Sequence, residues 1–157
     1  MKKIVFVCAG NTCRSPMAEG YFNSLADNRN LGDHLKGFSA GTNAAYGMKA
    51  SEIAIELCQK DGINISSHVS QPLTPELAAE SYLILTMTEK QKQEILKQFQ
   101  QMQGKLFTLK EFVHEKGDIE DPIGTSLEVY EKTYREIKKA VEIAFERIKN
   151  SENSDRK

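Results

Sequence analysis

The sequence of 157 residues lacks the features that mark several specialised classes of protein. It contains only 4 prolines and 10 glycines with 39% hydrophobic residues, which argues against a collagen-like, a membrane-embedded or a disordered chain. Its 21 lysines and arginines balance 22 aspartates and glutamates, so no overall field attracts nucleic acid or an acidic membrane surface. We therefore expect one globular domain over residues 1–150, a disordered tail at 151–157, and neither nucleic acid nor membrane as a partner.

Cysteine is scarce as well. The three cysteines, Cys8, Cys13 and Cys58, are an odd number and do not suggest the disulfide framework of a small secreted protein. The apolar run near the N-terminus is too short for a secretory signal, so a cytoplasmic location with reduced thiols is predicted. The sequence has no metal-binding motif and no dinucleotide fingerprint, and we expect no metal or other cofactor. Two of the three cysteines nevertheless lie within six positions of each other, and this pair needs an explanation.

Short apolar runs alternate with helical patterns along the chain. Strands are predicted over 4–8, 36–41, 82–87 and 106–109, and helices after 15, over 50–62, after 88 and over 127–148. Ser15 is predicted as a helix N-cap with Pro16 in the first turn, and capping boxes are predicted at Thr88 and Thr125. This alternation predicts an α/β fold in which helices cover both faces of a parallel sheet. Ligands bind such sheets at the carboxyl ends of the strands, where Cys8 falls.

The segment between the first strand and the first helix reads Cys-Ala-Gly-Asn-Thr-Cys-Arg-Ser over residues 8–15. A loop that turns its backbone N–H groups inward at a helix N-terminus binds a dianion such as phosphate. Arg14 can hold two phosphate oxygens at once, and the same positive environment favours the thiolate of Cys8 as a nucleophile. The predicted phosphate-binding residues are Ala9, Gly10, Asn11, Thr12, Cys13, Arg14 and Ser15.

With this Cys-x5-Arg-Ser motif directly after the first strand, the chain resembles the low-molecular-weight protein tyrosine phosphatase family. Ser-Ala-Gly at 39–41, Asp-Pro at 121–122 and the long final helix follow in the family's order, so the resemblance covers nearly the whole chain. It implies a four-stranded parallel sheet with helices on both faces and a phosphate loop between strand 1 and helix 1. It also implies hydrolysis of phosphorylated protein side chains through a phosphocysteine intermediate.

The resemblance assigns the general acid to Asp121, because the family's acid lies in an Asp-Pro loop at this point. Breaking a phosphate ester or a phosphoramidate requires a proton for the leaving group, and the same carboxyl group can then take a proton from water. An Asp-Pro pair taken alone is more often just a turn. Asp118 and Glu120 are the nearby alternatives for this role and are interpreted as solvated loop charges.

The resemblance further implies a hydrogen-bond network that holds the phosphate loop in shape, in which Ser15 also donates to the sulfur of Cys8. In this family the second loop cysteine, here Cys13, can form a disulfide with Cys8 under oxidation and protect it. Cys58 lies on the apolar face of its helix and is predicted to belong to the core. The residues that match the network are Asn11, Ser15, Ser39 and His68.

The residue two positions before the arginine indicates the substrate. Tyrosine phosphatases of the family usually carry a branched aliphatic residue there, whereas the bacterial protein arginine phosphatases carry threonine, as this chain does at Thr12. Threonine leaves room for a planar guanidinium group and offers it a hydroxyl, and ionised Asp121 would complete the recognition. Ala9 and Ile123 depart from the arginine-phosphatase pattern, and Tyr46 remains available as an aromatic wall. Phosphoarginine in proteins is the predicted substrate, with phosphotyrosine as the alternative.

Two other functions share parts of this pattern. Thioredoxin-coupled arsenate reductases have the same loop, but they need two further redox cysteines, and no cysteine occurs from residue 63 to residue 157. A phosphate-binding module without catalysis would not need the nucleophile and the acid, yet Cys8, Arg14 and Asp121 are all present. We expect a monomeric enzyme that acts on phosphorylated proteins.

Overall fold

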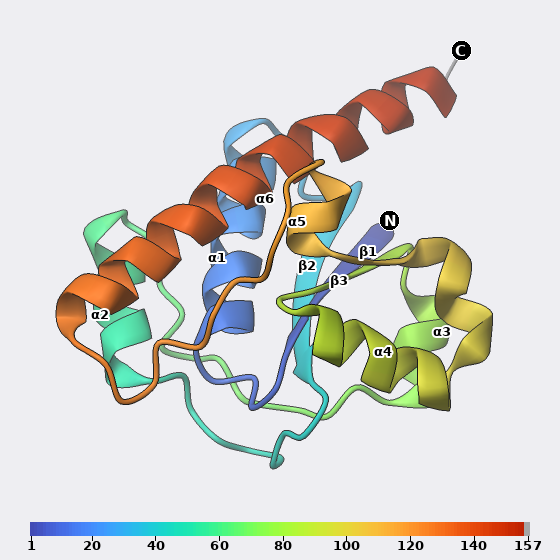
Figure 1. The fold of residues 1–157 in the computed structure, drawn as a ribbon. Helices are drawn as coiled ribbons and strands as arrows, with labels where there is room; N and C mark the ends of the chain where they lie inside the picture. Colours follow the sequence, from blue (N-terminus) through green and yellow to red (C-terminus); the bar gives the residue numbers. More distant parts are fainter. Residues whose placement is uncertain (156–157) are drawn as a thin grey trace.

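Four parallel strands in the order β2-β1-β3-β4 form the central sheet of the computed structural model, which describes residues 1–155. The strands are β1 (Lys2–Cys8), β2 (Leu35–Gly41), β3 (Leu83–Thr86) and β4 (Leu106–Thr108). The helices are α1 (Arg14–Asn28), α2 (Glu52–Lys60), α3 (Pro75–Glu80), α4 (Glu89–Gln98), the 3-10 helix η1 (Gln100–Lys105), α5 (Leu109–Phe112) and α6 (Leu127–Asp155). The predicted α/β fold with a four-stranded parallel sheet is confirmed (Figure 1).

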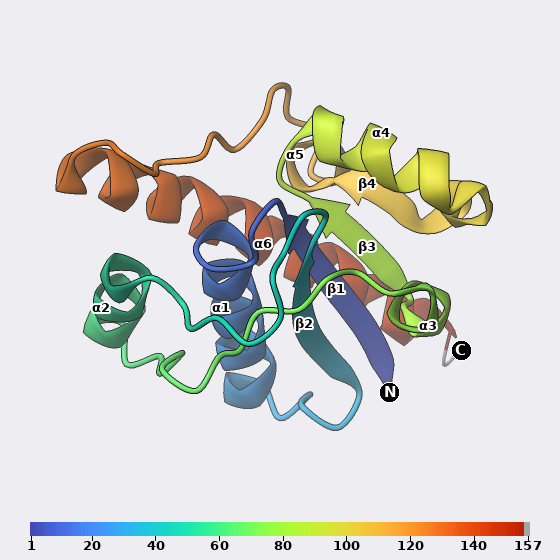
Figure 2. The same cartoon turned by 90° about the horizontal axis from the view of Figure 1, so that it is seen from below.

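Side chains alternate along β1 between two separate cores. Phe6 and Cys8 belong to the core that α1, α2, α5 and α6 cover, whereas Val5 and Val7 belong to the core that α3, α4 and η1 cover. A strand that is buried on both faces reads as a continuous apolar run, which is why β1 does not alternate between polar and apolar residues. Figure 2 shows α1 and α2 on one side of the sheet and α3 and α4 on the other.

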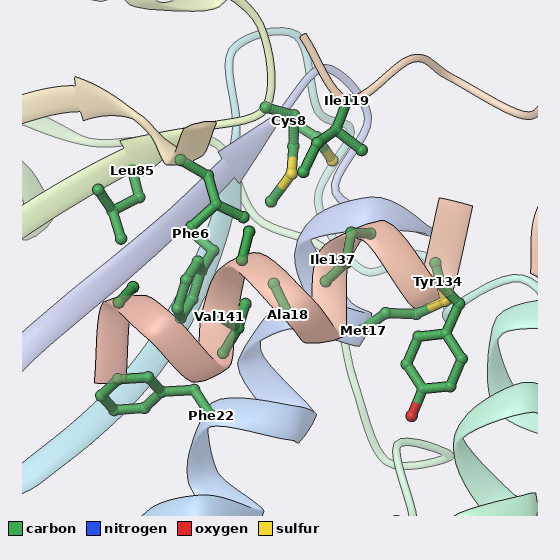
Figure 3. Close-up of a cluster of buried hydrophobic side chains, with 14 of the residues drawn as sticks. Phe6, Cys8, Met17, Ala18, Phe22, Leu85, Ile119, Tyr134, Ile137 and Val141 are labelled. Carbon is green, nitrogen blue, oxygen red and sulfur yellow. The ribbon is translucent and has the colours of Figure 1, made fainter. Parts of the chain in front are cut away.

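Aromatic rings join β1, α1 and α6 in the larger core. The ring centroid of Phe22 lies 5.7 Å from that of Phe6 and 5.3 Å from that of Phe145. Both pairs are tilted or edge-on, the geometries that aromatic rings prefer. Figure 3 shows Cys8 and Ile119 in the same cluster, so the main core of the domain fixes the residue that ends β1.

The start of α1 differs from the prediction. The helix begins at Arg14 with Cys13 as the preceding residue, so the prediction that Ser15 is the N-cap is wrong. The Ser15 hydroxyl lies 2.9 Å from the Cys8 sulfur and is therefore directed to the loop before the helix. Pro16 still lies in the first helical turn, where a backbone N–H has no intrahelical partner.

One of the two predicted capping boxes exists. Gln91 donates its amide to the Thr88 hydroxyl and accepts from the Thr88 amide, so the box at the start of α4 is confirmed. The box at Thr125 is wrong, because the Thr125 hydroxyl donates to the carbonyl of Pro122. Ser126 precedes α6 instead, and its hydroxyl accepts a backbone N–H of the first helical turn at 3.4 Å.

Helix α6 is longer than predicted. It runs for 29 residues to Asp155 and so includes positions 151–155, which were assigned to a disordered tail, while 156–157 lie outside the described residues. The polar composition indicated the end of the helix, but no glycine or proline follows to stop it. Neither α6 nor any other helix within residues 1–155 combines the length and the apolar character needed to cross a membrane.

A segment after α2 runs beside the end of β2. Gly41 donates its amide to Gln71 and accepts from the amide of Leu73, in a parallel arrangement. The carboxyl ends of β1, β2 and β3 lie at one edge of the sheet, because all the strands are parallel. The loops that follow these strands therefore gather around the segment between β1 and α1.

Candidate active site

The loop between β1 and α1 turns through Asn11. The φ angle of this residue is 58°, in the left-handed region, and its side chain is fully buried. Asparagine tolerates this conformation better than most residues that carry a side chain. The turn allows the chain to pass from Cys8 at the end of β1 to Arg14 at the start of α1 over the short segment predicted to bind phosphate.

Hydrogen bonds from other segments hold the carbonyl groups of this loop on its outer side. The carbonyl of Cys8 accepts from the amide of Thr42, and the carbonyl of Ala9 accepts from the amide of Asn43, each at 3.0 Å. Both donors belong to the segment that follows β2. The first half of the loop is thus tied by its backbone to the neighbouring strand connection.

The second half of the loop is held in the same way. The carbonyl of Thr12 accepts from the amide of Ser51 at 2.8 Å, and the carbonyl of Asn11 lies 2.7 Å from Nε2 of His68. In a trans peptide the N–H points opposite to the preceding C=O, so each outward carbonyl directs the next N–H to the inner side. A set of inward amides of this kind is the arrangement by which backbone nests bind anions. The amides directed inward by these four carbonyls are those of Ala9, Gly10, Thr12 and Cys13.

Gly41 lets the end of β2 approach this loop closely. A Cβ atom at position 41 would collide with the carbonyl oxygen of Ala9 and would lie 2.7 Å from the Cβ of Ala44. No residue with a side chain fits there without a shift of the phosphate loop. This close approach is the physical reason for glycine in the Ser-Ala-Gly motif at 39–41.

A chain of two hydrogen bonds runs from Asn11 to the candidate nucleophile. Nδ2 of Asn11 donates to Oγ of Ser15 at 2.8 Å, and Oγ of Ser15 lies 2.9 Å from Sγ of Cys8. All three residues are buried. The amide of Asn11 orients the hydroxyl of Ser15, so the hydroxyl can direct its proton to the sulfur when the thiol is ionised.

His68 connects the phosphate loop to α1. Its Nε2 faces the carbonyl of Asn11, which can only accept, so this nitrogen carries a proton, and its Nδ1 lies 3.7 Å from Oε2 of Glu19. Burial alone would lower the pKa of His68, but the hydrogen bonds to Glu19 and Asn11 and the charge of Glu19 outweigh it and raise the pKa. The imidazole is thereby biased towards the charged form, which donates from both nitrogens.

Ser39 reaches this network through two other residues. Its hydroxyl donates to Oε2 of Glu19 at 3.4 Å, and its carbonyl accepts from the side-chain amide of Gln71 at 3.0 Å. The backbone amide of Gln71 in turn donates to Oδ1 of Asn11 at 2.9 Å. Ser39 therefore contributes to the position of Asn11 without touching the loop itself.

Arg14 and Asp121 bring the loop before α6 to the phosphate loop. The side chain of Arg14 is only 5% exposed; its Nη1 donates to the carbonyl of Ile119 at 2.8 Å, and its Nη2 lies 3.8 Å from Oδ2 of Asp121. A guanidinium group carries five N–H donors, so others remain for the oxygens of a bound phosphoryl group. The side chain of Asp121 is 45% exposed, and its Oδ1 accepts from the amide of Ile123, which leaves Oδ2 turned towards Arg14.

The other two cysteines are also buried, and all three are free thiols. Burial raises the pKa of Cys13 to about 12, and the nearby Cys8 acts in the same direction. Cys13 is therefore a protonated thiol at neutral pH. Cys58 is fully buried on α2 and burial raises its pKa to about 11, so the prediction that it belongs to the core is confirmed.

A family model described as low molecular weight phosphotyrosine protein phosphatase matches residues 3–154. The chain belongs to this family. One relative among the low molecular weight phosphatases, the protein-arginine-phosphatase of Bacillus subtilis, is 42% identical over 147 residues, which are 93% of this chain and 96% of the relative. The low molecular weight protein-tyrosine-phosphatase PtpB of Staphylococcus epidermidis is 38% identical over 135 residues, which are 86% of this chain and 91% of the relative.

A solved structure shares this phosphatase fold closely. It is that of the YwlE arginine phosphatase, a cysteine-to-serine mutant with a phosphorylated active-site serine, and it superposes with a TM-score of 0.88 at 40% sequence identity. The match covers 94% of this chain and 95% of that one. The resemblance inferred from the phosphate-loop motif is thus confirmed for the family and the fold.

Sequence reasoning missed several contributors to this phosphatase site. Glu19 lies four positions after Ser15 on α1, so helical spacing alone could have placed both on one face. Gln71 lies in an irregular segment without a periodic pattern, and Ile119 acts through its backbone carbonyl, so no sequence pattern indicates either residue. Asp118 was interpreted as a solvated charge, but its Oδ1 accepts from the first amide of α4, that of Glu89, at 2.9 Å.

Proposed function

We propose that this chain is a protein phosphatase that transfers a phosphoryl group from a protein side chain to Cys8 and then to water. The observation that carries the proposal is the convergence of three groups from separate segments: Cys8 at the end of β1, Arg14 at the start of α1 and Asp121 before α6. Family membership supports the same chemistry, and one relative is phosphorylated on the serine that replaces its cysteine.

In the first step the thiolate of Cys8 attacks phosphorus. An S–P bond forms, and the P–N or P–O bond to the leaving side chain breaks, with its electron pair going to nitrogen or oxygen. Asp121 gives its proton to that atom, so the leaving group does not depart as an anion. Arg14 and the inward amides of Ala9, Gly10, Thr12 and Cys13 hold the phosphoryl oxygens as negative charge accumulates on them.

In the second step the carboxylate of Asp121 takes a proton from water as the water oxygen attacks phosphorus. The S–P bond breaks, its electron pair returns to Cys8, and inorganic phosphate is released. The hydroxyl of Ser15, 2.9 Å from the sulfur, donates to the departing thiolate. The network of Asn11, Ser39 and His68 keeps that hydroxyl and the loop in place.

Phosphoarginine is the preferred substrate in this proposal. Thr12 lies half-buried in the phosphate loop, where its small polar side chain leaves space for a guanidinium group. The oxygen of the Asp121 carboxyl group that does not carry the proton can accept a hydrogen bond from an N–H of the same group before Asp121 acts as the acid. A relative that is 42% identical is named a protein-arginine-phosphatase. The name of PtpB and the 77% exposed Tyr46 favour phosphotyrosine as the second candidate.

The test compares kcat/KM on phosphoarginine and phosphotyrosine peptides of one sequence. Thr12→Ile should shift the ratio towards phosphotyrosine about tenfold, because isoleucine fills the space and removes the hydroxyl. Thr42→Ile is the matched control, since Thr42 contacts the loop through its backbone amide. A wild-type preference for phosphotyrosine would overturn the choice of substrate, and an unchanged ratio in Thr12→Ile would show that Thr12 does not set it.

The redox role and the setting of the enzyme also belong to the proposal. Oxidation of Cys8 and its capture by Cys13 would give the reversible disulfide that the resemblance implies. Three free cysteines fit a reducing compartment such as the cytoplasm. We propose that the chain acts there as a monomer on phosphorylated proteins.

A further inference from the structure

We infer that Asp118 is a positioning residue for Asp121: by binding the first amide of α4, it fixes the loop that holds the proposed acid beside the phosphate loop. The inference rests on the proposed function, since it concerns the group that protonates the leaving atom. Oδ1 of Asp118 accepts from the amide of Glu89 at 2.9 Å, across 29 positions of the chain. Asp121 follows Asp118 by three residues, and its Oδ2 lies 3.8 Å from Nη2 of Arg14.

The loop between α5 and α6 is held at two consecutive residues, Asp118 and Ile119, by the segment that follows β3. Next to Asp118, the fully buried Ile119 donates its amide to the carbonyl of Met87 at 2.9 Å and accepts from Arg14. Beyond this clamp, residues 120–126 are exposed except for Pro122. The loop is therefore a fixed point at 118–119 followed by an exposed tip.

The two anchors have different effects on the tip. Ile119 alone fixes a position through its backbone, but the chain on either side can still rotate about it. Asp118 adds a second anchor on a different element, α4, and two adjacent anchors fix a direction as well. Asp121 follows Asp118 by three residues, a span of about 10 Å at most, so a change of direction at the clamp moves its carboxylate directly.

Helix α4 does not depend on Asp118 for its own start. Thr88 and Gln91 already form a complete capping box there. Asp118 binds the amide of Glu89, one of the first amides of a helix, which have no partner within it. The negative charge of Asp118 is favoured at this positive end of the helix. The helix therefore offers a ready partner, and the loop is the segment that gains from the bond.

The leaving group provides the test. Phenol is a poor leaving group that needs a proton, whereas 4-nitrophenol departs readily without one. Asp118→Ala should lower kcat/KM for phenyl phosphate about tenfold more than for 4-nitrophenyl phosphate, because a misplaced acid costs rate only where its proton is needed. Asp118→Asn keeps an acceptor oxygen in place. Its loss of kcat/KM should therefore differ by less than about twofold between the two substrates.

Three controls separate positioning from a general loss of structure. Glu120→Ala removes the same charge from an exposed site in the same loop. It should leave the ratio of kcat/KM for the two substrates unchanged. The inhibition constant of inorganic phosphate, which reports the phosphate loop, should be the same in Asp118→Ala and in the wild type. In an Asp121→Asn background, Asp118→Ala should not change the ratio further, since the group it positions has lost its proton.

The outcomes distinguish the inference from the proposed function. If Asp121→Asn does not produce the leaving-group effect, Asp121 is not the acid and the proposed mechanism fails. If Asp121→Asn produces the effect but Asp118→Ala lowers kcat/KM for both substrates equally, or for neither, the positioning role alone is wrong. It is also wrong if Asp118→Ala changes the ratio further in the Asp121→Asn background.

Discussion

Replacing Ser15 by alanine removes the hydroxyl that lies 2.9 Å from the sulfur of Cys8. In the second step this sulfur leaves phosphorus as a thiolate, and a hydrogen bond to a charged group is worth about 1.5–3 kcal/mol. With about 1.4 kcal/mol per factor of ten, hydrolysis of the phosphocysteine should slow by about 10- to 150-fold. The amide of Asn11 also loses its buried acceptor, so the free energy of unfolding should fall by about 1–3 kcal/mol.

Rapid-quench kinetics separate the two steps. In Ser15→Ala the first turnover should release about one equivalent of leaving group per enzyme, followed by a slow steady state, because hydrolysis of the intermediate becomes limiting. The phosphorylated enzyme should accumulate in the same interval and be detectable by mass. A loss of stability alone would lower the amount of active enzyme without producing this burst.

Ser39→Ala is the matched control, because it removes another buried serine hydroxyl, one that lies 3.4 Å from Glu19 in the outer part of the network. Such a long hydrogen bond is weak, so hydrolysis of the intermediate should change by less than about threefold. The reasoning is refuted if the two variants slow this step equally, or if Ser15→Ala loses activity without a burst.

Two further predictions concern the supports of the phosphate loop. Because the pKa of His68 is raised in the folded state, its contribution to stability is complete below the unfolded value of about 6.5 and is lost as the pH rises through the folded value. His68→Gln should therefore lower the urea unfolding free energy more at about pH 5 than at about pH 9, and a difference independent of pH would contradict this account. Gly41→Ala should destabilise the fold by about 1–3 kcal/mol and raise the inhibition constant of inorganic phosphate, because the new Cβ collides with the carbonyl of Ala9. Gly104→Ala, where a Cβ meets nothing within 4 Å, is the control, and equal effects of the two substitutions would count against the argument.

Local patterns predicted those elements whose burial is continuous. The apolar run of β1 and the three-four spacing of α6 each reflect one side of the chain facing a core, so periodicity reveals them. The hydroxyl groups were harder to predict. Ser15 and Thr125 each stand where a helix cap is plausible, but tertiary structure offers them the sulfur of Cys8 and the carbonyl of Pro122.

In the candidate site, too, residues in local motifs could be predicted, and residues from distant segments could not be predicted from local patterns. Cys8 and Arg14 are adjacent to a strand end and a helix start, so a local motif reveals them. Asp121 comes from a distant loop and was predicted through family resemblance. The contact of Asp118 was not predicted, because a carboxylate in a polar loop shows no sign in the sequence that a helix start from 29 positions earlier lies beside it.

The outward hydrogen bonds of the phosphate loop have an energetic consequence. The peptide dipoles of the loop are oriented while the chain folds, so they do not have to rearrange when a dianion arrives. The residues that enforce this order bind the carbonyl groups of the loop; they are Thr42, Asn43, Ser51 and His68. In the proposed function, a nearly neutral protein thereby concentrates its attraction for anions in one loop. Because that field arises from backbone groups, the loop can carry alanine at position 9 without losing its electrostatic character.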